Sequence, residues 1–261
     1  MDEWSFYFEK GDCMNIDFID KAFKEYVNTF NMEDENIYLK YEHTFEVVKI
    51  SEQIARKLNL NQQEIDLAKT IAYLHDIGRF EQVAKTNTFQ DSVMDHADNG
   101  VDLLFNRNLI ERFNIDKKYY QVIEKAIRNH NKLEIIDNLE KDEEVFVKLI
   151  RDADKVDIYR VRVKYLDNNF LEVPSQINLD DFFHHKCINL KNRKNKSDSL
   201  LCVMAFIYDL NYQETIEVLK DIGYYEKFFN NINVSEDKEV QDIFKKLKLE
   251  VYKYLEIEEE V

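Results

Sequence analysis

The sequence predicts an all-α protein on three observations. Its 261 residues include only four glycines and one proline, whereas an all-β chain of this length needs many more turn residues. Glu, Lys, Leu and Ile are abundant, as is usual in helices. Apolar residues make up 44% and aromatic residues 13% of the chain, so a sizeable core can be buried. This length suits one large helical domain, or one and a half small ones.

The amino-terminal part is expected to form helices at 17–30, 36–58, 61–74, 92–105, 116–129 and 143–160. Apolar side chains recur on one face of each segment. Asn61 and Glu64 match a capping box, which marks the beginning of the third helix. Gly78 is a natural residue to stop that helix, because glycine favours the left-handed conformation just past a helix end. Residues 79–91 are therefore expected to form a polar loop.

The carboxy-terminal part begins with a less regular segment, 165–196, which contains Pro174. Further helices are expected at 197–210, at 214–222 and from about 235 to 255. Gly223 should stop the second of these. Ser235, followed by two acidic residues, should cap the last one.

The domain organisation follows from these segments. We expect residues 1–160 to form a helical core and residues 161–261 to form a helical extension that packs on it, together one compact domain. No internal repeat is evident. The acidic end, 256–260, is expected to fray.

Charge and cysteine usage restrict the partners and the compartment. The net charge of −16 makes duplex DNA or RNA an unexpected general partner, so an anionic substrate needs a local positive site such as metal ions. Cys13, Cys187 and Cys202 lie far apart without metal-type spacing, which predicts a reduced, cytoplasmic protein. Neither a signal sequence at the start nor a membrane-spanning segment is expected.

The most informative stretch places His75 and Asp76 side by side at the end of an apolar helical run. Two different metal-binding side chains therefore project from nearly the same point of the backbone. Other candidate ligands, each on the apolar face of an expected helix, are His43, His96, His130 and Asp154. The order of these residues predicts a buried metal centre.

A plainer interpretation applies to each histidine taken alone. A single histidine on an apolar face is usually a core residue with a hydrogen bond. Four inward histidines and two inward aspartates in one core are different, because buried carboxylates need a common charge partner. One or two divalent cations supply it, and these ligand types suit Fe, Mn, Co, Ni or Zn better than Mg or Ca. His184 and His185, in the irregular segment, are interpreted as structural or solvated.

The ordered set resembles the signature of the HD superfamily of metal-dependent phosphohydrolases. The segments that resemble a bacterial branch of this superfamily are LHDIGRFEQ at 74–82, DH at 95–96, RNHN at 128–131 and RDADK at 151–155. The similarity covers roughly residues 17–160, and the helices after 195 look like the carboxy-terminal extension of that branch. An HD-domain helical bundle with such an extension is the fold that the resemblance implies.

The resemblance also implies roles for the ligands. One metal ion would be held by His43, His75, Asp76 and Asp154. A second would be held by His96 and His130, with Asp76 bridging the pair. The implied reaction is attack on phosphorus by a metal-bridged hydroxide, with Asp76 and Arg79 as the catalytic side chains. Related enzymes with a basic residue at the position of Arg79 use it to contact the substrate phosphate.

Weaker candidates accompany this set. Lys132 and Lys155 could contact phosphate, but each is more often a solvated lysine. Asp157, one turn after Asp154, could orient a ligand or could be an exposed helix charge.

The leading hypothesis is a metal-dependent phosphomonoesterase or phosphodiesterase acting on a nucleotide or another small phosphorylated metabolite. Cyclic dinucleotides are disfavoured, because the segment after His130 lacks the Gly-Tyr-Pro sequence of the enzymes that cleave them. The alternatives are an HD-type di-iron oxygenase and a non-enzymatic nucleotide-sensing module. The sequence leaves the substrate, the metal and the oligomeric state open.

Overall fold

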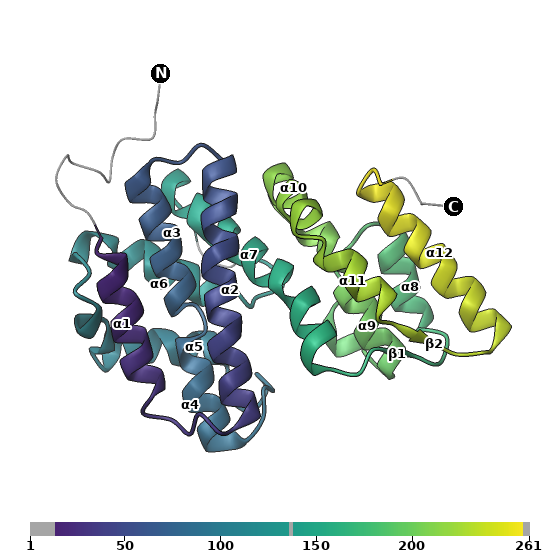
Figure 1. Ribbon diagram of the computed structural model, residues 1–261, viewed down its shortest axis with the longest axis horizontal. Helices are drawn as coiled ribbons and strands as arrows, with labels where there is room; N and C mark the ends of the chain where they lie inside the picture. Colours follow the sequence, from purple (N-terminus) through teal and green to yellow (C-terminus); the bar gives the residue numbers. More distant parts are fainter. Residues whose placement is uncertain (1–13, 136–137, 258–261) are drawn as a thin grey trace. The chain divides into compact units, whose positions relative to one another are not determined.

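Helices account for nearly all regular structure in the computed structural model, which describes residues 14–135 and 138–257 (Figure 1). Within those ranges the one extended pairing joins β1 (Asn169–Phe170) to β2 (Asn233–Val234) in parallel. The predicted all-α class is confirmed. Cys13 and the end of the predicted acidic tail lie outside the described residues.

The chain divides into two units between Asp154 and Lys155. This division lies a few residues before the predicted boundary at 160, inside the helix α7 (Lys141–Tyr165), which is longer than expected at both ends. Packing of the carboxy-terminal part on the amino-terminal part stays a prediction.

The first unit consists of helices joined by short turns. Besides the first part of α7, they are α1 (Ile16–Val27), α2 (Glu35–Lys57), α3 (Gln62–Leu74), α4 (Ile77–Thr86), α5 (His96–Val101), a π-helical turn (Asp102–Asn106), 3-10 turns (Leu109–Phe113 and Lys117–Tyr119) and α6 (Tyr120–Asn129). Helix α2 packs along α3, α1 also packs on α3, and α5 lies between α4 and α6 (Figure 1).

Capping side chains fix where these helices begin. Asp34 accepts a hydrogen bond from the backbone of Asn36 at the start of α2. The predicted capping box at α3 is present, since Asn61 accepts from the backbone of Glu64 and Glu64 accepts from the backbone of Asn61. Such contacts satisfy amide groups that have no partner inside the helix.

An aromatic cluster joins α1 to α4 and forms much of the core of the first unit. Its members are Phe23, Tyr26, Phe30, Tyr41, Phe45, Tyr73 and Phe80. Phe23 and Phe80 are fully buried, with ring centroids 5.8 Å apart. The Tyr26 hydroxyl donates to the carbonyl oxygen of Ile77 at 3.3 Å. The cluster therefore holds the start of α4 against the other helices.

The predicted loop at 79–91 is wrong, because α4 occupies most of it. Asp76 interrupts the helical path with φ −104° and ψ 16°, and a new apolar face then begins with Ile77 and Phe80. Gly78 lies in the first turn of α4 and does not end a helix there. A Cβ atom at this position would lie 2.2 Å from the carbonyl oxygen of His96. Glycine is required here by the close approach of α4 and α5.

The helix predicted at 92–105 begins later, at His96. Asp95 is its cap and accepts hydrogen bonds from the backbone of Ala97 and of Asp98. The preceding residues form turns, since this carboxylate satisfies the first amide groups and so fixes the helix start at His96. The same segment continues as the π-helical turn that begins at Asp102.

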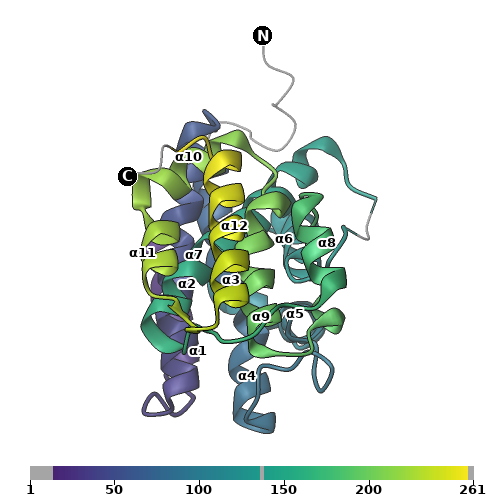
Figure 2. The same cartoon turned by 90° about the vertical axis from the view of Figure 1, so that its right-hand side faces the viewer.

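The second unit is also built mainly of helices (Figure 2). They are α8 (Gln176–Phe183), a 3-10 turn (Leu190–Asn192), α9 (Lys196–Met204), a 3-10 turn (Ala205–Asp209), α10 (Gln213–Ile222), α11 (Tyr224–Asn230) and α12 (Lys238–Tyr254). Helix α8, which packs on α9, and helix α11 were not predicted. Gly223 ends α10 with φ 67°, as predicted. The cap of α12 is Asp237 and not Ser235, whose hydroxyl accepts from the backbone of Asp237.

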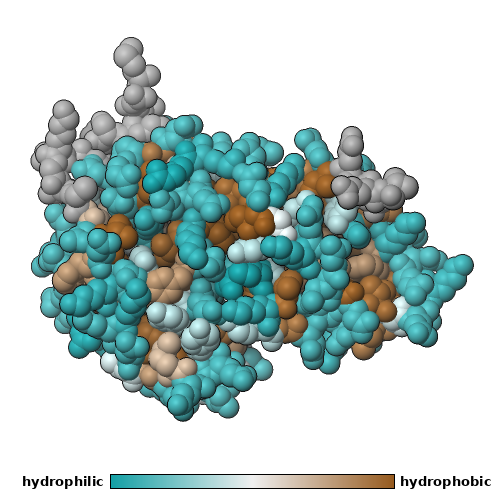
Figure 3. All heavy atoms as spheres, in the orientation of Figure 1, coloured by the Kyte–Doolittle hydropathy of each residue, from teal (hydrophilic) through white to brown (hydrophobic). Residues whose placement is uncertain are grey.

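The surface is mainly hydrophilic on the face drawn in Figure 3, and its apolar residues form separate patches. Charged residues make up 34% of the sequence, in agreement with this surface. Across the described ranges, every helix is too short or too polar to cross a membrane.

Candidate metal centre

The six predicted ligands lie at two kinds of position in the helices of the first unit. His43 and Asp154 lie inside the long helices α2 and α7. The other four lie at helix ends or between helices: His75 caps α3, Asp76 precedes α4, His96 begins α5 and His130 caps α6. The break between α3 and α4 lets two adjacent side chains face the same interior.

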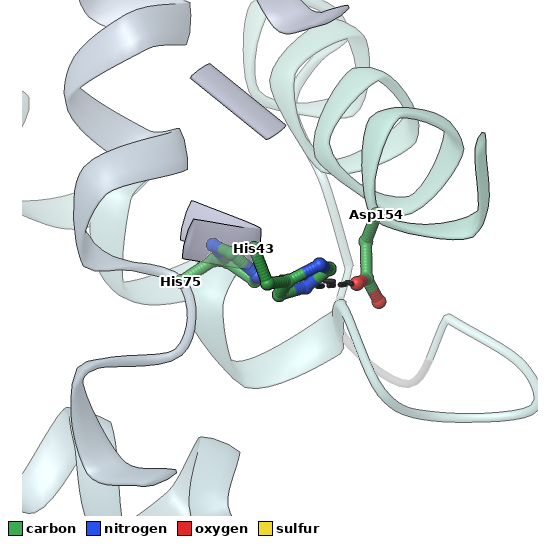
Figure 4. Close-up of side chains that lie close together, drawn as sticks. All are labelled: His43, His75 and Asp154. Carbon is green, nitrogen blue, oxygen red and sulfur yellow. Dashed lines mark ion pairs between the residues drawn. The ribbon is translucent and has the colours of Figure 1, made fainter. Parts of the chain in front are cut away.

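The structure brings these side chains together in two groups. The first group is His43, His75 and Asp154, and the second is Asp76, His96 and His130. In each group, one ligand atom from every residue lies within 4.8 Å of the others. In the first group, Nε2 of His43 lies 3.0 Å from Oδ1 of Asp154, and His75 lies beside them (Figure 4).

Asp76 connects the two groups through its two carboxylate oxygens. Its Oδ2 atom lies 3.7 Å from Nε2 of His43 and 3.5 Å from Nε2 of His75. Its Oδ1 atom lies 3.2 Å from Nε2 of His96 and 3.6 Å from Nε2 of His130. Each oxygen therefore faces the imidazoles of a different group, which is the geometry that a bridging carboxylate requires.

Burial sets the protonation states of the centre. The side chains of His43 and His75 are fully buried, and Asp76 is 2% exposed. Burial lowers the pKa of His75 to about 3 and that of His96 to about 4, because a charged imidazolium is poorly solvated there. Burial alone would raise the pKa of Asp76, but the Lys40 ammonium and the nearby imidazoles hold it well below its usual range. Neutral imidazoles and ionised carboxylates are the forms that bind metal ions.

The hydrogen bonds of three imidazoles fix where their lone pairs point. The Nδ1 atom of His75 lies 2.7 Å from the carbonyl oxygen of Ala72, and Nδ1 of His130 lies 2.6 Å from that of Ile127. A carbonyl oxygen only accepts, so each Nδ1 must donate. A neutral imidazole has one N–H group, so both Nε2 atoms are left as bare acceptors.

His96 completes this pattern. Its Nδ1 atom lies 2.7 Å from Oδ1 of Asp91, a carboxylate that also only accepts. Its Nε2 atom lies 2.8 Å from Nε2 of His130. Two acceptor lone pairs at this distance repel each other unless a cation lies against both. The buried Nε2 atom of His75 likewise has no hydrogen-bond partner. A divalent ion fits this donor set, because all the available atoms are imidazole nitrogens and carboxylate oxygens.

A network of side chains holds Asp91 beside His96. The Nη1 atom of Arg79 donates to Oδ1 of Asp91 at 2.8 Å, to Oε1 of Gln82 at 2.8 Å and to the carbonyl oxygen of Phe89 at 2.9 Å. Gln82 also donates to the carbonyl oxygen of Met94 at 2.6 Å. The arginine and the glutamine of α4 therefore tie down residues 87–95, the segment that connects α4 to α5. Asp91 was not predicted, and no periodic pattern marks it.

Arg79 lies next to the centre, but its position in the secondary structure differs from the prediction. It belongs to the first turn of α4 and does not follow a helix end. Its Nε atom is buried without a hydrogen bond and lies 3.6 Å from Oδ1 of Asp76. The predicted contact with a substrate phosphate stays a prediction.

Lys40 is a further residue of the centre that the sequence interpretation missed. Its ammonium lies 2.6 Å from Oδ2 of Asp76, and its side chain is 12% exposed. The sequence feature that could have identified Lys40 is its position three residues before His43, which places both side chains on one face of α2.

The weaker candidates pair elsewhere. Lys132 forms an ion pair with Asp95 at 2.6 Å. Lys155 pairs with Asp209 in the second unit. Asp157 is buried and binds Arg160 through both carboxylate oxygens. In the described part of the chain, none of these residues joins the two groups of ligands.

His184 and His185 also lie away from the ligand groups. His185 contacts Glu250 at 2.8 Å and stacks on Tyr208, and the side chain of His184 faces the carbonyl oxygen of Asp180 at 2.6 Å. These contacts agree with the structural interpretation of the pair.

Three comparisons with known proteins gave matches. Residues 41–159 match the family model of the HD domain. Ribonuclease Y of Mycoplasmoides gallisepticum is 27% identical over 214 residues, which are 77% of this chain and 33% of the relative, so the chain spans about a third of that protein. A crystal structure described as a predicted HD superfamily hydrolase, from an uncultured Thermotogales bacterium, is 18% identical, with a TM-score of 0.36; the match covers 81% of this chain and 90% of that one. All six predicted ligands lie inside the segment that matches the HD domain.

Proposed function

We propose that this chain, whose residues 41–159 match the HD-domain family model, is a metal-dependent phosphohydrolase acting on a nucleotide or another small phosphorylated metabolite. One observation carries the proposal. Acceptor nitrogens of His75, His96 and His130 converge in a buried space around the ionised carboxylate of Asp76. Without a metal ion this arrangement places the lone pairs of the imidazoles against one another and against the carboxylate.

The ligands divide between two ions in this proposal. His43, His75 and Asp154 hold the first ion together with Oδ2 of Asp76. His96 and His130 hold the second together with Oδ1 of Asp76. Bound divalent transition-metal ions supply Lewis-acid stabilisation of phosphoryl oxygens and a water nucleophile at neutral pH.

The protein's own side chains prepare this chemistry. The carbonyl oxygens of Ala72 and Ile127 hold the imidazoles of His75 and His130 in the tautomer that exposes Nε2. Asp91 does the same for His96, and such outer contacts commonly strengthen metal ligands. Arg79, whose Nε atom is buried without a hydrogen bond, is proposed to contact a phosphoryl oxygen of the substrate.

The net charge and one comparison guide the choice of test substrates. With a net charge of −16, the protein attracts a phosphorylated substrate only through local positive groups. The relative named as a ribonuclease is a reason to include short RNA diesters among the test substrates. Phosphomonoesters and nucleotides complete the panel.

Elemental analysis of protein purified without chelators tests the metal centre first. Two transition-metal ions per chain are expected. The His75→Ala variant should lose metal, whereas His185→Ala, which removes a histidine outside the ligand groups, should retain it. Equal metal content in the two variants, or a metal-free wild type after saturation, contradicts the proposed centre.

A substrate panel with Mn, Co and Ni tests the reaction. Hydrolysis of a phosphoester that requires His75 supports the proposal. Iron content together with substrate-dependent oxygen uptake would identify an oxygenase instead. Tight nucleotide binding without turnover would identify a sensing module.

A further inference from the structure

Lys40 reaches the metal centre from α2, one turn before His43. Its Nζ atom lies 2.6 Å from Oδ2 of Asp76, and only 12% of the side chain is exposed. Among the described residues, Asp76 is the only carboxylate with which Lys40 forms an ion pair. The position is unusual, because lysines are seldom this buried.

Two cations bracket the bridging carboxylate. Lys40 lies against Oδ2 of Asp76, and the Nε atom of Arg79 lies 3.6 Å from Oδ1. Both cations also face the ring of Phe89, at 5.8 Å for Nζ of Lys40 and 5.9 Å for Cζ of Arg79. Arg79 is anchored by three hydrogen bonds of its Nη1 atom. Lys40 has no such anchor besides Asp76.

The charges around Asp76 change when metal ions bind. A carboxylate that coordinates two divalent ions has its negative charge neutralised by them. The ammonium of Lys40 then keeps its position in a largely buried site but loses its counter-ion. An unpaired buried ammonium is unfavourable, so the loaded centre is expected to recruit an anion beside Lys40.

We propose that Lys40 binds a phosphoryl oxygen of the substrate and thereby forms, with Arg79, a two-point clamp for the phosphate. The inference rests on the proposed phosphohydrolase function and adds a substrate contact to it. A compact ammonium with three donors suits an oxygen of tetrahedral phosphate.

Binding of inorganic phosphate to the metal-saturated protein, measured by titration calorimetry, tests this contact without relying on turnover. Lys40→Met removes the charge and keeps an unbranched side chain. We expect a roughly tenfold to hundredfold loss of phosphate affinity, the usual size of a lost charge-assisted hydrogen bond. Lys40→Arg should retain most of the affinity. The matched control is Lys49→Met, on the same helix, whose ammonium pairs with Glu46 at 2.6 Å and is 63% exposed.

Metal content must be measured in the same samples. Removing a cation beside Asp76 should leave metal affinity unchanged or higher, because like charges repel. Lys40→Met protein that holds two ions and binds phosphate as the wild type does overturns the inference and leaves the proposed function standing. Loss of ions from Lys40→Met also overturns it, since Lys40 would then only support Asp76.

The proposed function can fail separately from the inference. A saturated wild type that holds no ions contradicts the function and removes the basis of the inference with it. If Lys40→Met does not fold, Lys40→Gln supplies the same comparison with a polar side chain. Retained phosphate affinity in that variant overturns the inference as well.

Discussion

The two groups of the metal centre hold their ligands in different ways. In the first group, His43 and Asp154 project from the middle of the long helices α2 and α7. In the second group, His96 begins a six-residue helix and His130 follows the end of another. The second group also depends on Asp91, which lies in the segment between α4 and α5. Two ligands of the first group thus project from long helices, whereas His96 of the second group depends on a carboxylate outside the helices.

Because of this difference, the affinities for the two proposed ions should respond differently to substitutions. Substitutions around residues 87–95 should lower the affinity for the second ion and leave the affinity for the first unchanged. A substitution at Asp76, which contacts both groups, should affect both. The following predictions test this division, beginning with the largest effect.

Asp76→Ala should remove both ions and nearly all hydrolysis, because each group loses a carboxylate oxygen. His96→Ala should remove the second ion and leave the first. Elemental analysis and turnover with the best substrate measure both effects. Near-normal metal content in Asp76→Ala would disprove the bridge.

Gly78→Ala should destabilise the fold and displace the second group. Its Cβ atom would lie 2.2 Å from the carbonyl oxygen of His96 and 2.6 Å from the backbone nitrogen of Gly100. Backbone atoms cannot move aside as a flexible side chain can, so a loss of about 1–3 kcal/mol of unfolding free energy is expected. Chemical denaturation measures it.

Gly100→Ala is the matched control for this substitution. A Cβ atom there would meet the side chain of Ile77 at 3.4 Å. That contact is tight but adjustable, and alanine favours a helix by about 1 kcal/mol over glycine. Equal destabilisation by the two substitutions would show that the close approach at Gly78 has no special importance.

Asp91→Ala should lower the affinity for the second ion by about tenfold to a hundredfold, the usual effect of losing a carboxylate that orients a histidine ligand. The first ion should bind as before, because the ligand that Asp91 orients is His96 of the second group. Competition with a chelator measures each affinity. Asp98→Ala, which removes a carboxylate that is 54% exposed, is the control. An equal loss of affinity for both ions would show that the two groups do not behave independently.

Arg107→Ala should have the smallest effect. Arg107 binds both oxygens of Glu81 at 3.0 and 2.8 Å and so links α4 to the end of the π-helical turn. This contact lowers the pKa of Glu81 to about 2, below the value of about 4.3 for an unfolded chain. The stabilisation that the contact between Arg107 and Glu81 contributes is therefore present above about pH 4.3 and is lost as the pH falls towards 2. Solvent screening limits it to about 1 kcal/mol or less.

Urea unfolding at pH 7 and pH 3 measures this contribution. The difference between wild type and Arg107→Ala should be smaller at pH 3 than at pH 7, and the two proteins should have the same metal affinity at pH 7. A difference that grows on acidification would contradict the assigned pKa direction.

The sequence could predict which ligand side chains meet, because each of the six lies on an apolar helical face or beside its end. The capping box at Asn61 and the helix stop at Gly223 were equally local signals, and both are present. Local patterns of this kind survive in the folded protein because they act within one or two turns of helix.

The parts that could not be predicted depend on contacts between distant segments. In the sequence, Gly78 could mark the end of a helix or a close approach of two helices. Only the position of α5 shows that the second interpretation is correct. Lys40 resembles any lysine on a helix until Asp76 is placed beside it. Asp91 belongs to a segment without periodicity, and its importance comes from the fold around His96.

The way in which residues 87–95 are attached has a consequence for how the sequence of this segment can change. Arg79 and Gln82, both on α4, hold this segment through Asp91 and the carbonyl oxygens of Phe89 and Met94. Gln90, Ser92 and Val93 lie between these anchors with exposed side chains. Substitutions at these three positions should therefore leave the anchoring contacts of the segment intact. For the proposed phosphohydrolase, we expect this segment to tolerate sequence change at those positions while Asp91 keeps its place beside His96.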